Sequence, residues 1–258
     1  MAVITFLSDF GYTDHYVAAV KARIISQDAQ AQIIDISHGI EPFNIAQAEY
    51  VFGAVYRDFP EGTVHLLAVD TQSRKDGGFL AAKYKGHYFL LADNGLLSLL
   101  TDGQPEVVIN LKTEFPQMSF PAKDLLAAAA VFLANGGDLD VLGERTHEFK
   151  QLLNRQLRLS DHAITGHVIY VDRFGNLITN ITRDSIDTIA HGRTFTIHFS
   201  RETISNIQPN YKQVNEGDFC CIYNSQGLLC IGINSGNAAE ALHLGFDSPV
   251  EIRFYPGS

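Results

Sequence analysis

Val3-Ile4-Thr5-Phe6-Leu7-Ser8-Asp9-Phe10-Gly11 is the stretch that decides the fold. Residues 3–7 form an almost continuous apolar run, which is typical of a strand covered on both faces. The following turn is polar, and Thr13 can cap a helix whose apolar positions follow helical spacing at Tyr16, Val17, Val20 and Ile24. We therefore predict a soluble α/β protein in which the turn Ser8–Gly11 contributes to a small-molecule site, because ligands gather at the carboxyl ends of strands in such folds.

The same alternation continues through the first half of the chain. Glycines or turn residues separate the apolar runs from one another, which predicts strands at 32–36, 64–69, 79–84, 87–92 and 107–111 and helices at 45–59 and from 124 to the glycine pair at 136–137. Strands that alternate with helices indicate a mostly parallel sheet with helices on both faces. We assign residues 1–155 to this domain.

The pattern changes after about residue 160. Short strand-like runs now dominate, with one short helix at 183–189 and a hairpin turn at 224–227; the strands are expected at 167–170, 193–199, 218–223, 228–233 and 250–254. This pattern predicts a second, smaller domain over residues 162–258, built as a β sandwich or barrel. Residues 147–161 are the expected linker.

Composition narrows the class of protein. A net charge of −10 argues against a nucleic-acid partner, which would require a basic face. No apolar run approaches membrane-spanning length, and residues 1–7 lack the basic flank and cleavage site of a signal peptide. The three cysteines, at 220, 221 and 230, have no metal-binding spacing and are expected to be small buried hydrophobes. We therefore expect a cytoplasmic protein without a membrane partner.

Acidic residues follow three predicted strands. Asp9 can bind both hydroxyls of a ribose or, alternatively, cap the next helix; Asp70 can orient a nucleophile or act as a base, or simply form a turn. Asp93, before Asn94-Gly95, is expected to belong to a tight turn that leads into a helix. The chain has no GxGxxG, Walker A, HExxH or GxSxG motif, so neither a phosphate cradle nor a metal site is predicted.

Asp172-Arg173-Phe174-Gly175-Asn176 is the most distinctive string of the second half. Phe174 can stack on a flat ring while Asn176 reads its edge, since an amide donates and accepts in one plane. Asp172 can bind an ammonium group. The alternative is a β-turn with an exposed aromatic side chain. His38 and His65 lie beside predicted strands, where a structural role is expected.

Taken together, the strings resemble one family, the S-adenosylmethionine (SAM) hydroxide adenosyltransferases, which are relatives of the fluorinases and chlorinases. The matching strings occur in family order along nearly the whole chain: Ser8–Gly11, Asp35–His38 with Pro42-Phe43, Gly62–His65 with Val69-Asp70, Ala92–Leu97, Asp172–Asn176 with Thr179–Ile181, and Asn224-Ser225 with Gly227–Leu229.

The resemblance implies a Rossmann-like N-terminal domain, a C-terminal β-barrel domain and a homotrimer whose sites lie between neighbouring subunits. It implies that water attacks the ribose 5′ carbon of SAM, giving adenosine and methionine, with SAM as substrate and no cofactor. By position, Asp9 holds the ribose hydroxyls and Phe43 packs near the sugar or methionine. The remaining contacts implied are Asp172 and Ser225 to methionine, and Phe174, Asn176 and the backbone near Ile233 and Ser235 to adenine.

The water-activating group departs from the family pattern. Family hydrolases place an Asp, an Arg and a His around the water, and only Asp70 matches directly. Gly77 occupies the Arg position and Pro121 the His position, so Arg74 or Lys123 would have to compensate. A halogenase is not expected, because a carboxylate at position 70 would repel a halide.

Three hypotheses follow from these residues. The chain is a SAM hydrolase that relies on Asp70, alone or with Arg74. Alternatively, it binds SAM or adenosine without turnover, or it acts on another adenosyl compound.

Overall fold

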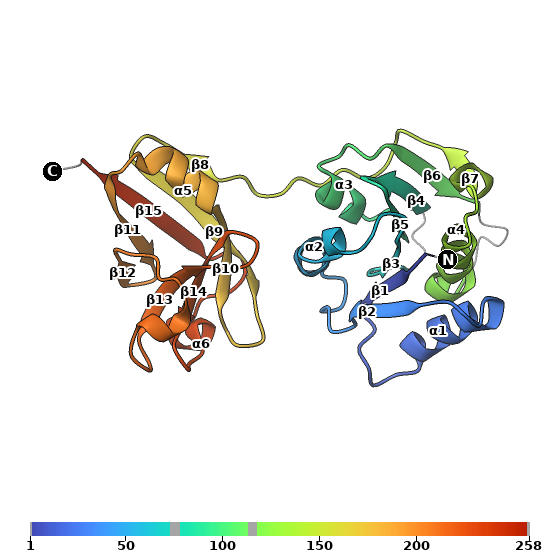
Figure 1. Ribbon diagram of the computed structural model, residues 1–258, viewed down its shortest axis with the longest axis horizontal. Helices are drawn as coiled ribbons and strands as arrows, with labels where there is room; N and C mark the ends of the chain where they lie inside the picture. The colour runs from blue at the N-terminus through green and yellow to red at the C-terminus, as the bar shows by residue number, and fades with distance from the viewer. Residues whose placement is uncertain (1, 73–77, 113–117, 257–258) are drawn as a thin grey trace. The chain divides into compact units, whose positions relative to one another are not determined.

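The chain folds into two compact units, the first ending at Asn154 and the second beginning at Arg155. The computed structural model describes residues 2–72, 78–112 and 118–256 (Figure 1). Each unit has a sheet and a hydrophobic core of its own.

The first unit is built on a seven-stranded sheet of order β2-β1-β3-β5-β4-β6-β7. Strands β2, β1, β3 and β5 pair in parallel, whereas β4, β6 and β7 pair with antiparallel neighbours, so that five of the seven strands run in one direction. The mostly parallel sheet predicted from the sequence is thus confirmed. The strands are β1 (Ile4–Ser8), β2 (Ile33–Ser37), β3 (Val64–Ala68), β4 (Phe79–Tyr84), β5 (His87–Ala92), β6 (Val107–Leu111) and β7 (Gly143–Arg145).

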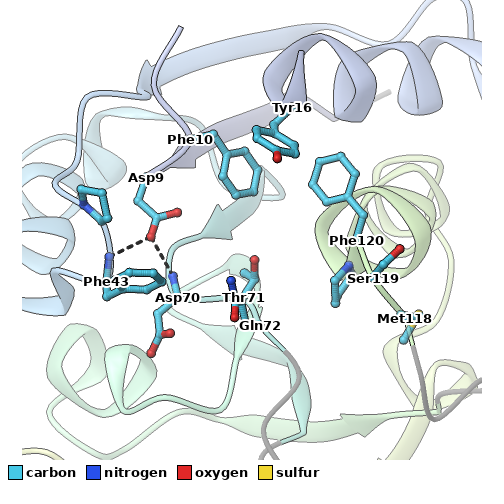
Figure 2. Close-up of a pocket in the computed structure, with 12 residues that line it drawn as sticks. Asp9, Phe10, Tyr16, Phe43, Asp70, Thr71, Gln72, Met118, Ser119 and Phe120 are labelled. Carbon is cyan, nitrogen blue, oxygen red and sulfur yellow. Dashed lines mark hydrogen bonds between the residues drawn. The ribbon is translucent and has the colours of Figure 1, made fainter. Parts of the chain in front are cut away.

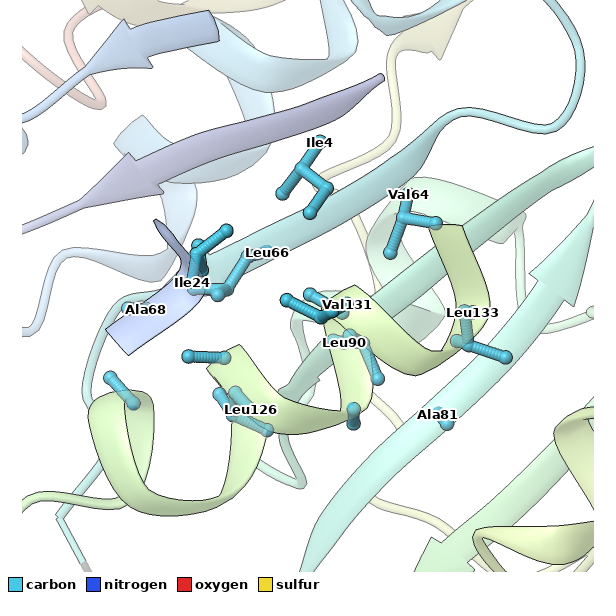
Figure 3. Close-up of a cluster of buried hydrophobic side chains, with 14 of the residues drawn as sticks. Ile4, Ile24, Val64, Leu66, Ala68, Ala81, Leu90, Leu126, Val131 and Leu133 are labelled. Carbon is cyan, nitrogen blue, oxygen red and sulfur yellow. The ribbon is translucent and has the colours of Figure 1, made fainter. Parts of the chain in front are cut away.

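Helices cover both faces of this sheet. On one face α1 (Tyr16–Gln27) and α4 (Ala127–Ala134) pack over β1 and β3, in the cluster drawn in Figure 3. On the other face lie α2 (Ile45–Gly53) and α3 (Leu96–Thr101). Strands β1 and β3 are buried along their whole length because both of their faces are covered.

The details of these helices differ from the sequence-based expectation in several places. The N-cap of α1 is His15 rather than Thr13, and it makes no side-chain capping bond; Tyr16 is 40% exposed instead of buried. The helix expected over residues 45–59 ends at Gly53 and is followed by a short 3₁₀ turn, Tyr56–Asp58. Before α4, the segment Ala122–Leu126 winds as a π-helix.

The second unit is an antiparallel sheet of eight strands. Its order is β12-β11-β15-β9-β10-β14-β13, with β8 paired to β9; a bridge between Gln208 and Ile222 joins the segment after β12 to β13 and nearly closes the barrel. The strands are β8 (Arg158–Leu159), β9 (Ala163–Val171), β10 (Leu177–Thr182), β11 (Thr194–Phe199), β12 (Glu202–Ile204), β13 (Phe219–Tyr223), β14 (Leu228–Ile233) and β15 (Pro249–Tyr255), and the helices are α5 (Arg183–Ala190) and α6 (Ala238–Leu242). The barrel-like β domain is confirmed.

The expected linker is partly structured. Leu152 donates its N–H to Ser98 Oγ and Lys150 donates its N–H to Asp93 Oδ1, so the chain stays docked on the first unit to this point. Strand β8 already belongs to the second unit.

Two further sequence-based expectations concern membranes and cysteines. Among the described residues, no helix has the length and apolar character needed to cross a membrane. The three cysteines are free and buried, as predicted.

Candidate functional site

A cavity of about 570 Å³ opens where β1 and β3 end in the first unit. Asp9 follows β1 and Asp70 comes two residues after β3, so the sheet brings two strand-end carboxyl groups together (Figure 2). The cavity is lined by Asp9, Phe10, Tyr16, Pro42, Phe43, Asp70, Thr71, Gln72, Met118, Ser119, Phe120 and Pro121.

Asp9 is the hub of this cavity. Its Oδ2 accepts the backbone N–H of Phe43 at 3.0 Å and that of Asp70 at 3.1 Å. Both of these residues have left-handed backbones, with φ of 66° for Phe43 and 48° for Asp70. Such backbone conformations cost about 1–3 kcal/mol each for a non-glycine residue and cluster at functional sites. The Asp9 carboxylate therefore holds two strained residues in place and does not cap the following helix.

Aromatic rings form one wall of the cavity. Phe10 lies 5.7 Å from both Tyr16 and Phe120, and Tyr16 lies 5.5 Å from Phe120, measured between ring centroids. The edge-on and tilted packing seen in Figure 2 is the arrangement that aromatic pairs prefer. Phe43, which is 60% exposed, contributes a further ring.

Sequence reasoning missed most of this wall. Phe10 directly follows Asp9, so its place beside the site was readable from the sequence. Tyr16 was assigned to the helix core, and Phe120 reaches the cavity only through tertiary packing.

The cavity is acidic. Among the described residues that line it, Asp9 and Asp70 carry the only formal charges. Pro121 lines the cavity, and its side chain has no hydrogen-bonding group. Lys123 lies 3.7 Å from Asp124 in an exposed ion pair and is not a lining residue. Arg74 and Gly77 lie outside the described residues.

In the second unit, Asp172 organises the loop that joins β9 to β10. Asp172 Oδ1 accepts the N–H groups of Phe174 and Asn176, both at 2.9 Å, while Oδ2 accepts Asn176 Nδ2 at 2.8 Å. Asn176 is buried, whereas Phe174 is 75% exposed. The Asp172 carboxylate thus forms the turn that presents the aromatic ring.

The pairing of the strands shows where the other predicted ligand contacts, Ser225, Ile233 and Ser235, lie relative to this loop. Leu177 pairs with Ile231, which places the Asn176 end of β10 beside the Ile233 end of β14. Ser235, at φ 62°, lies two residues after Ile233 and accepts a hydrogen bond from Lys212 Nζ at 3.2 Å. Ser225 lies in the turn between β13 and β14, at the opposite end of that hairpin. Asn176 and Ile233 therefore lie at one end of this sheet, and Ser225 lies in the turn at the other end of the β13–β14 hairpin.

The other residues singled out in the sequence have structural roles. Asp93 Oδ1 accepts the Lys150 N–H at 2.8 Å, and Gly95, at φ 100°, is the N-cap of α3, as expected for a turn that leads into a helix. His65 is fully buried between Thr5 Oγ1, at 2.7 Å, and His87 Nδ1, at 3.1 Å. Burial, reinforced by the neighbouring His87, lowers the pKa of His65 to about 3.

Comparison with known proteins supports one family over nearly the whole chain. Family models match residues 4–143, as a SAM hydroxide adenosyltransferase N-terminal domain, and residues 166–251, as the corresponding C-terminal domain. A protein of Methanocaldococcus jannaschii named (R)-S-adenosyl-L-methionine hydrolase is 30% identical over 97% of this chain and 95% of its own length. A Nocardia brasiliensis fluorinase is 24% identical over 97% of this chain and 96% of its own length.

Solved structures agree with these matches. An uncharacterised conserved protein from Thermotoga maritima superposes with a TM-score of 0.89 at 29% identity, covering 97% of this chain and 100% of its own. A conserved hypothetical protein from Thermus thermophilus gives a TM-score of 0.79 at 29% identity, covering 99% of this chain and 100% of its own. With both family domains present in order and a relative 30% identical along almost its full length, this chain belongs to the SAM hydroxide adenosyltransferase family.

Proposed function

We propose that this protein binds SAM and hydrolyses it to adenosine and methionine by attack of water on the ribose 5′ carbon. The observation that carries the proposal is the Asp9 hub, which fixes the backbone of Asp70 and brings both carboxyl groups to one cavity. Two relatives that are 30% identical along nearly their full length are named (R)-S-adenosyl-L-methionine hydrolase, which supports the same reaction.

The charge and the walls of the cavity suit this substrate. SAM carries a sulfonium cation, and the two aspartates are the only charged residues among the described lining. Aromatic faces such as those of Phe10, Tyr16 and Phe120 also attract cations, by about 0.5–2 kcal/mol. A cationic, partly apolar ligand therefore fits this cavity better than an anion does.

Positioning of the water is the main chemical task. In the proposed reaction the water oxygen bonds to C5′ while the C5′–S bond breaks, and its electron pair returns to sulfur as the thioether of methionine. The proton leaves the water for the Asp70 carboxylate or for solvent. Because a sulfonium is already a good leaving group, no cofactor is required, and Asp9 holds the ribose so that water and sulfur stay in line.

Pro121 favours a second candidate, a protein that binds SAM or adenosine without turning it over. The ring lines the cavity where the family pattern has a histidine, and proline offers no side-chain donor or acceptor. Of the Asp, Arg and His that the family places around the water, Asp70 is then the one that remains among the described residues. If the protein is a hydrolase, we therefore expect it to be a slow one.

The second unit supplies the rest of the proposed site. We propose that the exposed Phe174 ring stacks on adenine, with Asn176 and the backbone near Ile233 and Ser235 behind it. In the proposed homotrimer, this surface of one subunit would meet the Asp9 cavity of its neighbour. Three free buried cysteines support a reducing compartment, and we propose the cytoplasm.

Chromatographic detection of adenosine from SAM tests the reaction. We expect Asp70→Asn to lower the rate by about a hundredfold, in the range typical for loss of a general base. Asp93→Asn is the matched control, since Asp93 also follows a strand but bonds Lys150 and lies outside the cavity lining. Wild-type protein that binds SAM by calorimetry yet releases no adenosine above background would replace hydrolysis with the binding function.

A further inference from the structure

A buried chain of polar groups runs behind the Asp9 turn, and the proposed reaction does not use it. Ser8 Oγ lies 2.6 Å from His38 Nδ1, and His38 Nε2 lies 3.2 Å from Asp35 Oδ1. Asp35 Oδ2 in turn accepts a hydrogen bond from Lys21 Nζ at 2.6 Å. Ser8 and His38 are both fully buried, so this series of polar groups leads from a surface ion pair between α1 and β2 to the buried end of β1, one residue before Asp9.

The charge of Asp35 determines which nitrogen of the His38 ring is expected to carry the hydrogen. Because an ionised carboxylate only accepts hydrogen bonds, we expect the hydrogen of the His38 ring to be on Nε2, which faces Asp35. The contact is electrostatic rather than a well-aligned hydrogen bond. The other ring nitrogen, Nδ1, is then an acceptor, and the Ser8 hydroxyl donates to it. The Ser8 oxygen keeps its lone pairs for the N–H of Phe10, at 3.4 Å.

His38 also shapes the turn through its backbone and its ring. Its carbonyl accepts the N–H of Gly11 at 2.8 Å. The ring meets Tyr12 edge-on at 5.2 Å and Phe6 at 4.5 Å, measured between centroids. His38 therefore contacts residues on both sides of Asp9, through its imidazole ring and its backbone carbonyl, although the side chain of Asp9 itself does not touch the ring.

Serine, histidine and aspartate also form the catalytic triads of hydrolases, but Ser8, His38 and Asp35 are not placed for nucleophilic catalysis. Ser8 has no exposed surface and does not line the cavity, so its oxygen cannot reach a substrate. A positioning role remains, because rigid support from a second layer of hydrogen bonds is what keeps a binding carboxylate in register.

We propose that Ser8, His38 and Asp35 form a positioning relay that holds the Asp9 carboxylate at the angle needed to bind the two hydroxyls of a ribose. This inference rests on the proposed function, in which Asp9 is the ribose contact. It assigns a role to the Asp35–His38 string, which lies outside the cavity lining.

A matched pair of buried hydroxyl groups on β1 gives the test. Ser8→Ala removes the relay hydroxyl, while Thr5→Val removes a fully buried hydroxyl that bonds His65 Nδ1 at 2.7 Å. Calorimetric affinities are measured for adenosine and for 2′,3′-dideoxyadenosine, which lacks both ribose hydroxyls. We expect Ser8→Ala to weaken adenosine by about tenfold, the cost of a misplaced charged hydrogen bond, and to leave the dideoxy compound unchanged. Equal weakening of both ligands, or the same diol-selective loss in Thr5→Val, would overturn the relay.

Histidine variants separate the two ends of the relay. The amide of Asn reaches the place of Nδ1 and that of Gln the place of Nε2, so His38→Asn keeps the Ser8 contact and His38→Gln the Asp35 contact. His38→Asn is expected to retain more of the preference for adenosine over the dideoxy compound. The reverse order would contradict the proposal.

Nuclear magnetic resonance tests the relay without a ligand. The nitrogen shifts of His38 are expected to report a neutral ring protonated on Nε2, and Ser8→Ala is expected to speed hydrogen exchange at the Phe10 amide. A ring protonated on Nδ1 would overturn the relay even if adenosine binds. Wild-type protein that binds neither nucleoside would instead refute the proposed function.

Discussion

Replacement of Asp9 tests whether one carboxylate holds the backbone of the cavity together. In Asp9→Ala, the N–H groups of Phe43 and Asp70 lose the oxygen they share, at 3.0 and 3.1 Å. A hydrogen bond to a charged group contributes about 1.5–3 kcal/mol. The Phe43 bond lies in an exposed setting where water can replace the oxygen, so we expect a total loss of about 2–4 kcal/mol in the free energy of unfolding.

Urea unfolding followed by circular dichroism measures this loss. Asp9→Asn keeps one acceptor oxygen and is expected to lose about half as much, because the amide retains lone pairs but not the charge. Asp14→Ala is the control, since it removes an exposed carboxylate from the same turn region. If Asp9→Ala is as stable as Asp14→Ala, the two left-handed residues do not depend on Asp9 and the hub does not exist.

Three further predictions concern stability. Burial, reinforced by the charge of Asp102, raises the pKa of Glu49 from 4.5 to about 7, so between these pH values Glu49 is protonated in the folded state and ionised in the unfolded state. The free energy of unfolding, measured with urea, should therefore fall by roughly 3 kcal/mol as the pH rises from 4.5 to 7. This pH dependence should be absent in Glu49→Gln. Burial lowers the pKa of His65 from 6.5 to about 3, so this ring stays neutral in the folded state while it is protonated in the unfolded state. The free energy of unfolding should therefore fall as the pH drops below 6.5, by roughly 3 kcal/mol at pH 4.5. A His65 ring found charged at pH 5 by nuclear magnetic resonance would contradict this prediction. Gly175 and Gly192 share a φ of 80°, but a Cβ at Gly175 would lie 1.9 Å from a side-chain oxygen while Gly192 faces open space. Gly192→Ala should therefore lose only about 1–2 kcal/mol of stability through backbone strain, and Gly175→Ala should lose more. If thermal unfolding shows the same loss in both variants, the close packing around Gly175 is refuted.

The fold was largely predictable because its signals are local. Runs such as Val107–Leu111 and Leu228–Ile233 are bounded by turn residues, and the structure places strands over these same ranges. Helix ends were less predictable. The apolar pattern continues past Gly53, but the α-helix stops there and a 3₁₀ turn takes over. Strand β10, whose six residues alternate poorly, was not predicted at all.

The candidate site was predictable only in part. Asp9 and Asp70 were identified because a polar residue after a buried strand points to the sheet edge. The rest of the aromatic wall was not, because Phe120 is far from Phe10 in the sequence and meets it only in the tertiary structure. The position of Ser225, in the turn at the far end of the β13–β14 hairpin from Ile233, likewise depends on strand pairing, which no short motif encodes.

The sequence by itself determined the strand-turn-helix order, the two domains, the acidic character and the family, because these depend on local periodicity and on short ordered strings. Only the tertiary structure decided what Asp9 touches. Its two backbone partners lie 34 and 61 residues away, and they reach one oxygen because β1 and β3 are neighbours and two residues take left-handed backbones. It also decided that Ser8 and His38 meet in a buried chain, since that contact requires β1 and β2 to pair and both side chains to lose their water.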